Sequence, residues 1–182
     1  MAKHFEIGEF PFHATEKRLP DEIYARALDR VVVSMLDVVV INPSGELFLG
    51  KRAWEPAKDL FWIIGGARNR GESFEETAEG HCKHELGIEV GPARFQEVGF
   101  YSYAFAKRRQ NPEGNGIHTD STVFAVQLTT EEVMMLKPNE EYSEVMWIRP
   151  EEVAQRAGEF HPAIVQICKD YLLSCSRHDS AV

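Results

Sequence analysis

Cysteine is rare in this sequence, and long apolar runs are missing. Cys82, Cys168 and Cys175 are the three cysteines among 182 residues. An odd number without a closely spaced pair argues against a disulfide framework and favours reduced, buried thiols. No apolar run approaches the roughly 20 residues that a membrane-spanning helix needs. The sequence therefore predicts neither a membrane partner nor a fold held by disulfides.

Positive charge is also in short supply. The chain has 20 Lys and Arg against 29 Asp and Glu, a formal net charge of −9. Because nucleic-acid binding needs a basic surface to neutralise phosphates, no nucleic-acid partner is expected. The basic run Lys107-Arg108-Arg109 stands among Gly, Asn and Pro residues, so we interpret it as a solvated loop first and an anion contact second. The first 20 residues lack the apolar core of a signal peptide, which predicts a cytoplasmic protein.

What is present is the composition of an ordinary globular domain, with 43% hydrophobic and 27% charged residues. Runs rich in β-branched and apolar residues predict strands over 31–41, 47–49, 60–64, 95–105, 122–128 and 146–148. Helices are predicted from Pro20 onward and over 72–86, 150–157 and 162–173. The turn residues Asn42-Pro43-Ser44-Gly45 predict a hairpin between the first two strands. This order of elements predicts an α+β fold, with a mixed sheet between helices.

The pattern divides the chain into three parts. Residues 1–30 are expected to form an N-terminal arm and a helix that pack on the domain. Residues 31–175 are expected to form the domain itself, and residues 176–182 a disordered tail. The length suits one domain with a sizeable core.

One segment combines backbone freedom with carboxylates. An apolar run ends at Gly65-Gly66, and a short loop leads into the predicted helix 72–86, which carries several acids. Glycine lets a backbone carbonyl approach a ligand or metal ion closely, because no Cβ stands in the way. A helix carboxylate opposite such a carbonyl makes an oxygen-rich site of the kind that Mg²⁺ prefers.

This segment resembles the Nudix box, which reads Gly, five residues, Glu, seven residues, and then Arg-Glu-apolar-any-Glu-Glu-any-Gly-apolar. Gly66, Glu72, Glu85, Gly87 and Ile88 fall at matching positions. The resemblance implies the Nudix hydrolase fold, a mixed β-sheet sandwiched between helices as α/β/α layers.

The C-terminal half of the box is rewritten. The position of the box arginine is Gly80, and two of the glutamates that normally hold divalent metal are His81 and His84. Fewer carboxylates weaken Mg²⁺ binding, because ligand charge sets the affinity for hard cations. His81, His84 and Glu85 are neighbours on one helix surface, so an alternative is a two-His, one-carboxylate site for Mn²⁺ or another transition metal. The other interpretation is that both histidines are surface residues or packed rings.

Over residues 31–153 the chain is most similar to the GDP-mannose mannosyl hydrolases, which also lack most of the box glutamates. Shared features include Leu36-Asp37, Gly50-Lys51-Arg52 and Trp147. This resemblance implies that water attacks the anomeric carbon of the sugar, while the nucleoside diphosphate leaves with one Mg²⁺ on its phosphates. It also implies a small nucleotide-sugar substrate and a homodimer.

The resemblance assigns roles to individual residues. Arg52, whose planar fork is always charged, is expected to contact the leaving phosphate. The residues expected to bind substrate are Asp37, Arg52, Arg68 and Tyr142. The residues expected to hold the metal are Gly66, Glu85 and Glu141, joined by His81 and His84 if a transition metal binds.

The general base of that subgroup falls on Tyr142 in this chain. A tyrosine is a poor base at neutral pH, because its ordinary pKa is about 10. His118, Asp120 and Glu144 lie nearby in the sequence and could replace it. The sequence leaves the choice among these three open.

Three functions are compatible with these patterns. The first is a divalent-metal-dependent hydrolase that releases nucleoside diphosphate and sugar from a GDP-mannose-like substrate. The second is a pyrophosphatase that cleaves the diphosphate itself. The third is a catalytically weak domain that binds a nucleotide without turnover, as the rewritten box and Tyr142 suggest.

Overall fold

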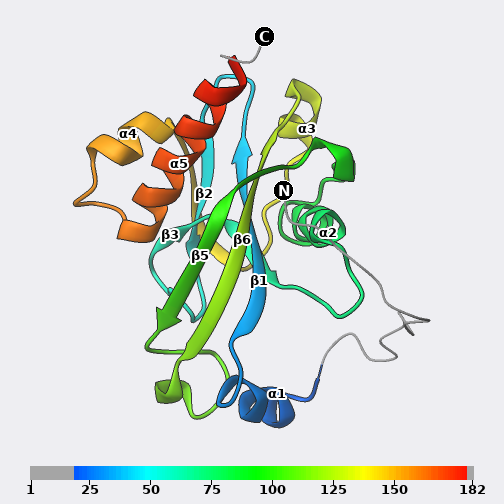
Figure 1. The fold of residues 1–182 in the computed structure, drawn as a ribbon, viewed down its shortest axis with the longest axis vertical. Coiled ribbons are helices and arrows are strands. Elements are labelled where there is room, and N and C mark those ends of the chain that lie inside the picture. Colours follow the sequence, from blue (N-terminus) through cyan, green and yellow to red (C-terminus); the bar gives the residue numbers. More distant parts are fainter. Residues whose placement is uncertain (1–18, 180–182) are drawn as a thin grey trace.

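The computed structural model describes residues 19–179 (Figure 1). Most of the predicted N-terminal arm, residues 1–18, lies outside this range, as do residues 180–182 of the predicted tail. Helix α1 (Asp21–Leu28) begins directly after Pro20 with two acids in its first turn, as predicted. In Figure 1 it lies at the end of the molecule where the first strand starts.

One mixed sheet organises the domain. Its seven strands run in the order β3-β2-β1-β6-β5, with β4 paired to β1 and β7 paired to β2. The strands are β1 (Val33–Ile41), β2 (Leu47–Arg52), β3 (Phe61–Trp62), β4 (Ile64–Ala67), β5 (Gln96–Phe105), β6 (Ile117–Gln127) and β7 (Tyr142–Ile148). β1 and β6 are parallel, and the other pairs are antiparallel. The predicted α+β class and mixed sheet are therefore confirmed.

Helices cover both faces of the sheet (Figure 1). α2 (Phe74–Leu86) packs on one face, and α4 (Pro150–Gln155) and α5 (Pro162–Asp179) pack on the other. The two-residue period of β1 divides the core, because alternate side chains of a strand point to opposite faces. Leu36 and Val38 join the apolar cluster beside α2, whereas Val39 and Ile41 join the cluster beside α5.

Helix α2 has strong signals at both ends. The Ser73 hydroxyl accepts a hydrogen bond from the Glu76 N–H, and the Glu76 carboxylate accepts one from the Ser73 N–H, which together form a capping box. Gly87 ends the helix in the left-handed conformation, with φ of 71°. The predicted helix over 72–86 is thus confirmed to within two residues at its start.

The segment over residues 60–64 differs from the prediction of one strand. β3 pairs with β2, but after Ile63 the chain changes neighbours, and β4 pairs with β1. The predicted hairpin between β1 and β2 forms. The two strands pair beside the turn, with Ile41 opposite Leu47. β4 pairs with an earlier part of β1, and this pairing places Gly65 opposite Asp37 and Gly66 opposite Leu36.

Other boundaries also moved. β6 begins at Ile117 and β7 at Tyr142, earlier than predicted, because residues 118–121 and 143–144 are polar and do not resemble a buried strand. The short helix α3 (Thr130–Met135) was not predicted. α5 continues through Asp179, so the first residues of the predicted disordered tail are helical.

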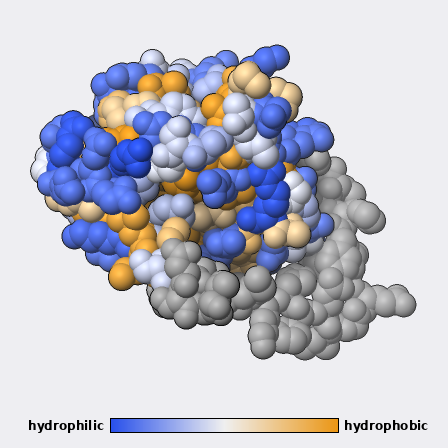
Figure 2. Space-filling view, turned by 90° about the horizontal axis from the view of Figure 1, so that it is seen from above, coloured by the Kyte–Doolittle hydropathy of each residue, from blue (hydrophilic) through white to orange (hydrophobic). Residues whose placement is uncertain are grey.

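The polarity of the surface and the state of the cysteines agree with what the composition predicts. The end of the molecule seen in Figure 2 is largely hydrophilic, with small apolar areas scattered among polar residues. Within residues 19–179, no helix combines the length and apolar character that crossing a membrane requires. Cys82 and Cys168 are free and buried, as predicted, whereas Cys175 is free and exposed.

We expect Ser73→Ala to lower the free energy of unfolding by about 1 kcal/mol, because it removes the N-cap acceptor of α2. Urea-induced unfolding followed by circular dichroism measures the loss. Ser176→Ala is the control, since it removes an exposed hydroxyl that donates a hydrogen bond to the Leu172 carbonyl within α5, away from the helix start. Equal losses in the two variants would contradict the capping role.

Candidate active site

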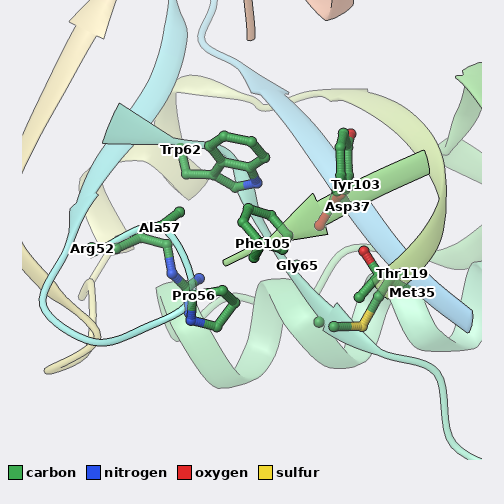
Figure 3. A pocket seen from close by; sticks show the side chains of 11 residues that line it. Met35, Asp37, Arg52, Pro56, Ala57, Trp62, Gly65, Tyr103, Phe105 and Thr119 are labelled. Carbon is green, nitrogen blue, oxygen red and sulfur yellow. The ribbon is translucent and has the colours of Figure 1, made fainter. Parts of the chain in front are cut away.

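Two pockets meet at Arg52, on the face of the sheet that α5 covers further along. The inner pocket is an open hollow of about 450 Å³, a volume that includes the solvent at its mouth. It is lined by Met35, Asp37, Arg52, Pro56, Ala57, Trp62, Gly65, Gly66, Tyr103, Phe105 and Thr119 (Figure 3). The outer pocket is lined by Tyr24, Met35, Arg52, Trp54, Glu55, Pro56, Arg108, Arg109, Gln110, Ile117 and Glu141. Because Met35, Arg52 and Pro56 belong to both, a single ligand can extend from one pocket into the other.

Asp37 is the acid of the inner pocket. It stands on β1 between core residues that face α2, so the alternation of the strand turns it to the opposite side. It is 7% exposed, and the Ser121 hydroxyl donates a 2.7 Å hydrogen bond to its Oδ2. Burial raises the pKa of Asp37 to about 6, against the opposing effect of the Ser121 hydrogen bond. The carboxylate is therefore poised to exchange a proton near neutral pH.

Gly65 makes room for this carboxylate. A Cβ at position 65 would lie 2.2 Å from Asp37 Oδ1 and 2.5 Å from the Leu36 carbonyl oxygen. Gly65 also has a φ of 152°, a backbone angle that residues with a side chain rarely adopt. The first glycine of the pair therefore sets the floor of the inner pocket.

Several buried polar atoms in the inner pocket have no hydrogen-bond partner among the described residues. They are Tyr103 Oη, Thr119 Oγ1 and Arg52 Nε. Buried polar groups are normally hydrogen-bonded, so these atoms fit a ligand or water that supplies donors and acceptors. Around them stand the rings of Trp62 and Phe105, with centroids 5.7 Å apart (Figure 3). Polar groups beside aromatic rings suit a ring-shaped ligand that carries hydroxyl groups.

The outer pocket combines cations with an exposed aromatic ring. Trp54 is 46% exposed, and the Arg109 guanidinium lies 5.4 Å from the centroid of its ring. Arg52 Nη2 lies 3.6 Å from Glu141 Oε2 at the junction of the pockets. The ring of Trp54 therefore offers a surface on which a planar group can stack beside positive charge.

The basic run was interpreted as a solvated loop, and for Arg108 this is wrong. Arg108 is 1% exposed, and its Nη1 donates to Asp29 Oδ1 at 2.7 Å and to the Gly116 carbonyl at 3.2 Å. Buried arginine requires such partners, and here they fasten the loop after β5 to the end of α1. Arg108 and Arg109, the next residue, both line the outer pocket.

Glu85 is a buried carboxylate whose two oxygens both have protein partners. It is 1% exposed. Oε1 accepts a 3.0 Å hydrogen bond from the Gly65 N–H and lies 3.3 Å from His81 Nδ1. Oε2 accepts a hydrogen bond from the Tyr142 hydroxyl. Burial and the adjacent Glu85 charge raise the pKa of Tyr142, which keeps its hydroxyl protonated as a donor.

The residues predicted to hold a metal form two separate pairs. His81 contacts Glu85, whereas His84 Nε2 lies 3.6 Å from Glu141 Oε1. Among residues 19–179, no group of three or more His, Cys, Asp and Glu side chains is arranged to hold a metal ion. The His81 ring also stands against Gly66, with Cε1 2.9 Å from where a Cβ of Gly66 would be. As they are arranged, these residues do not fit the predicted metal ion.

The three candidate bases lie outside both pockets. Thr119 and Ser121 of β6 face the inner pocket side, so His118 and Asp120 face the other side of the sheet. His118 Nε2 shares a 2.9 Å hydrogen bond with the Ser102 hydroxyl. Glu144 is an exposed residue of β7 whose carboxylate lies 3.9 Å from Lys51 Nζ. The structure therefore does not bring these three residues together with Asp37.

The remaining predicted substrate residues have structural partners. Arg68 donates a 3.0 Å hydrogen bond from Nε to the Glu72 carbonyl, and its guanidinium lies 4.2 Å from the Phe74 ring centroid. It holds the start of α2 and lines neither pocket. Sequence reasoning missed Tyr103, Phe105 and Thr119. The aromatic alternation in β5 could have indicated the first two.

Comparison with known proteins identifies the same fold. The NUDIX domain family matches residues 34–167. The MutT protein of Methanosarcina mazei is 16% identical, with a TM-score of 0.61 over 79% of this chain and 94% of that one. The NUDIX domain of Shewanella oneidensis NrtR, solved with ADP-ribose, is 13% identical, with a TM-score of 0.54 over 85% and 99%.

A third relative was solved with a metal ion. It is the bifunctional NMN adenylyltransferase/ADP-ribose pyrophosphatase of Francisella tularensis, complexed with AMP and a manganese ion. Identity is 16% and the TM-score is 0.60, over 85% of this chain and 45% of that one. This chain thus spans less than half of that protein, and at these identities all three relatives show the fold alone.

We expect Gly65→Ala to lower the free energy of unfolding by about 2 kcal/mol, because the new methyl group collides with Asp37 and with the backbone of β1. Gly91→Ala is the matched control, since a Cβ there meets nothing within 4 Å. Urea-induced unfolding of both variants measures the difference. An unchanged stability in Gly65→Ala would contradict the predicted collision and show that the backbone at Gly65 can move to accept a methyl group.

Proposed function

The chain belongs to the NUDIX domain family, and we propose that it hydrolyses a nucleoside diphosphate sugar to nucleoside diphosphate and free sugar. The family is one of hydrolases, which confirms the predicted enzyme class. GDP-mannose is the substrate to test first, because the resemblance to the GDP-mannose mannosyl hydrolases indicated it.

The position of Arg52 carries this proposal. Arg52 lines both pockets, and its buried Nε has no hydrogen-bond partner among the described residues. A guanidinium is always charged and presents a planar fork that matches phosphate oxygens. A ligand with two bulky ends joined by a diphosphate would therefore place that diphosphate at Arg52 and one end in each pocket.

The chemistry of the pockets suggests which end goes where. The inner pocket offers Asp37, Tyr103 and Thr119 to sugar hydroxyls, and the Trp62 ring to the apolar face of a sugar. The outer pocket offers the exposed Trp54 ring and Arg109 to a nucleobase. Stacking and cation–π contact are typical of base recognition.

In the proposed reaction, a water oxygen bonds to the anomeric carbon, and the bond from that carbon to the diphosphate oxygen breaks. The diphosphate leaves with the bonding electrons, beside the Arg52 charge. The Asp37 carboxylate takes the proton from water and later returns it to solvent. This step requires a carboxylate at the sugar, and Asp37 is the acid that lines the inner pocket.

One product analysis tests the proposal. The protein is incubated with GDP-mannose or ADP-ribose, in Mg²⁺, in Mn²⁺ or in EDTA, and products are identified by NMR. GDP and mannose support the proposal, whereas GMP and mannose 1-phosphate show cleavage of the diphosphate. The three conditions also test the predicted dependence on Mg²⁺.

We expect Arg52→Lys to lower kcat/KM about 10- to 100-fold, because a lysine cannot present two parallel donors to the diphosphate. Arg68→Lys is the control, since Arg68 lies outside both pockets, and its kcat/KM should remain within about twofold of wild type. If both variants lose the same activity, the diphosphate does not lie at Arg52.

We expect Asp37→Asn to lower kcat about 100-fold, because the amide cannot accept the proton from water. Steady-state kinetics on the released nucleoside diphosphate measure the change. Asp120→Asn removes a carboxylate from the opposite face of the sheet and should leave kcat close to wild type. The reverse ranking would restore Asp120 as the base.

A second candidate function is a domain that binds the nucleotide sugar without turnover. Two observations favour it: both oxygens of Glu85 have protein partners, and none of His118, Asp120 and Glu144 lines a pocket. Calorimetric binding of GDP-mannose that is weakened by Arg52→Lys, with no product under any condition, would establish this function instead.

A further inference from the structure

We propose that a hydrogen-bond network has replaced the metal ion at Glu85, so that no divalent cation binds to this carboxylate. Nudix hydrolases typically use divalent metals, and the Francisella relative was solved with manganese. In this chain the Glu85 carboxylate is surrounded by protein groups, namely Tyr142, Gly65 and His81. The inference concerns Glu85 alone and does not depend on the substrate proposed above.

The first step is the saturation of the carboxylate. Glu85 comes from α2, and its partners come from β4 and β7 as well as from α2 itself. Glu85 Oε1 accepts a 3.0 Å hydrogen bond from the Gly65 N–H and lies 3.3 Å from His81 Nδ1. Glu85 Oε2 accepts a hydrogen bond from the Tyr142 hydroxyl. A cation could bind to Oε2 only by displacing the hydroxyl, and to Oε1 only by moving the backbone or the imidazole.

The second step is that Tyr142 is fixed where it stands. Its ring covers Gly50, where a Cβ would lie 2.1 Å from Tyr142 Cδ1. It also packs edge-on against Phe48, with ring centroids 6.0 Å apart. A tyrosine wedged between the backbone of β2 and a core ring cannot swing away from Glu85 without opening the core.

The third step is that His81 fills the space between two of the predicted ligands. One side of its ring faces Glu85, and Cε1 stands 2.9 Å from the Cβ position of Gly66. The side chain of His81 is 16% exposed. A metal bound by Glu85 beside Gly66 would therefore have to displace this ring.

The fourth step is that the second carboxylate points elsewhere. Glu141 Oε1 lies 3.6 Å from His84, and Oε2 lies 3.6 Å from Arg52. Ca²⁺ and Mg²⁺ need several oxygens converging at bonding distance, and a single saturated carboxylate does not supply them.

Manganese binding tests the proposal directly. The electron paramagnetic resonance signal of free Mn²⁺ is titrated with untagged wild-type protein and with Glu85→Gln, which keeps the shape of the side chain and removes its charge. We expect the same free Mn²⁺ signal with both proteins at every concentration. A stoichiometric loss of signal with wild type that is absent in Glu85→Gln would overturn the proposal.

Thermal unfolding of the wild type and of Glu85→Gln gives a second readout. A metal that binds the folded chain raises the melting temperature, by more the tighter it binds. Equal shifts of the two proteins between EDTA and excess Mn²⁺ support the network, and a rise in the wild type that Glu85→Gln abolishes overturns it.

The network itself is tested by Tyr142→Phe. The matched control is Tyr101→Phe, because the Tyr101 hydroxyl donates a 2.7 Å hydrogen bond to Asp170, outside the site. We expect a larger fall in melting temperature for Tyr142→Phe, since it leaves a fully buried carboxylate oxygen without its donor. A fall no larger than that of Tyr101→Phe would overturn the role given to Tyr142.

Discussion

The burial of one carboxylate, Glu85, constrains much of this domain. A buried negative charge is costly unless it is hydrogen-bonded, and Glu85 obtains its donors from separate elements of the fold. The Gly65 N–H ties α2 to β4, and the Tyr142 hydroxyl ties α2 to β7. Since β4 pairs with β1 and β7 with β2, the same side chain connects the helix to both halves of the sheet.

The alternation of strands then determines what reaches the pockets. On β1, Leu36 and Val38 face α2, so Asp37 must face the other side, where Ser121 meets it. Arg52 ends β2 at a register shift opposite Tyr142. Such an irregularity re-aims a side chain, and here Arg52 reaches the junction of the two pockets. The acid side of the proposed site and its cationic side therefore come from neighbouring strands.

The parts of this arrangement that depend on local chemistry could be predicted from the sequence. The start and end of α2 and the glycine pair before it depend on local signals, and α2 forms within two residues of its predicted start. The partners of His81 and Tyr142 could not be predicted, because they depend on which strands become neighbours. The insertion of β4 beside β1 is a tertiary choice, as is the burial of Arg108 against Asp29. A charge run resembles a solvated loop until its partner across the fold is known.

The unusual residues around Glu85, in the segment that resembles the Nudix box, form one connected group. Metal ions normally neutralise clustered carboxylates, but here positions 81 and 84 are histidines, and Glu85 is buried as a single carboxylate. His81 provides an imidazole at 3.3 Å from the remaining carboxylate. Burial lowers the pKa of His81, but the hydrogen bond with Glu85 and the charges of Glu85 and Asp37 together raise it above its ordinary value. The Tyr142 hydroxyl provides the other donor. A tyrosine is a poor base at neutral pH but a permanent hydrogen-bond donor, which suits the buried Glu85 carboxylate beside it.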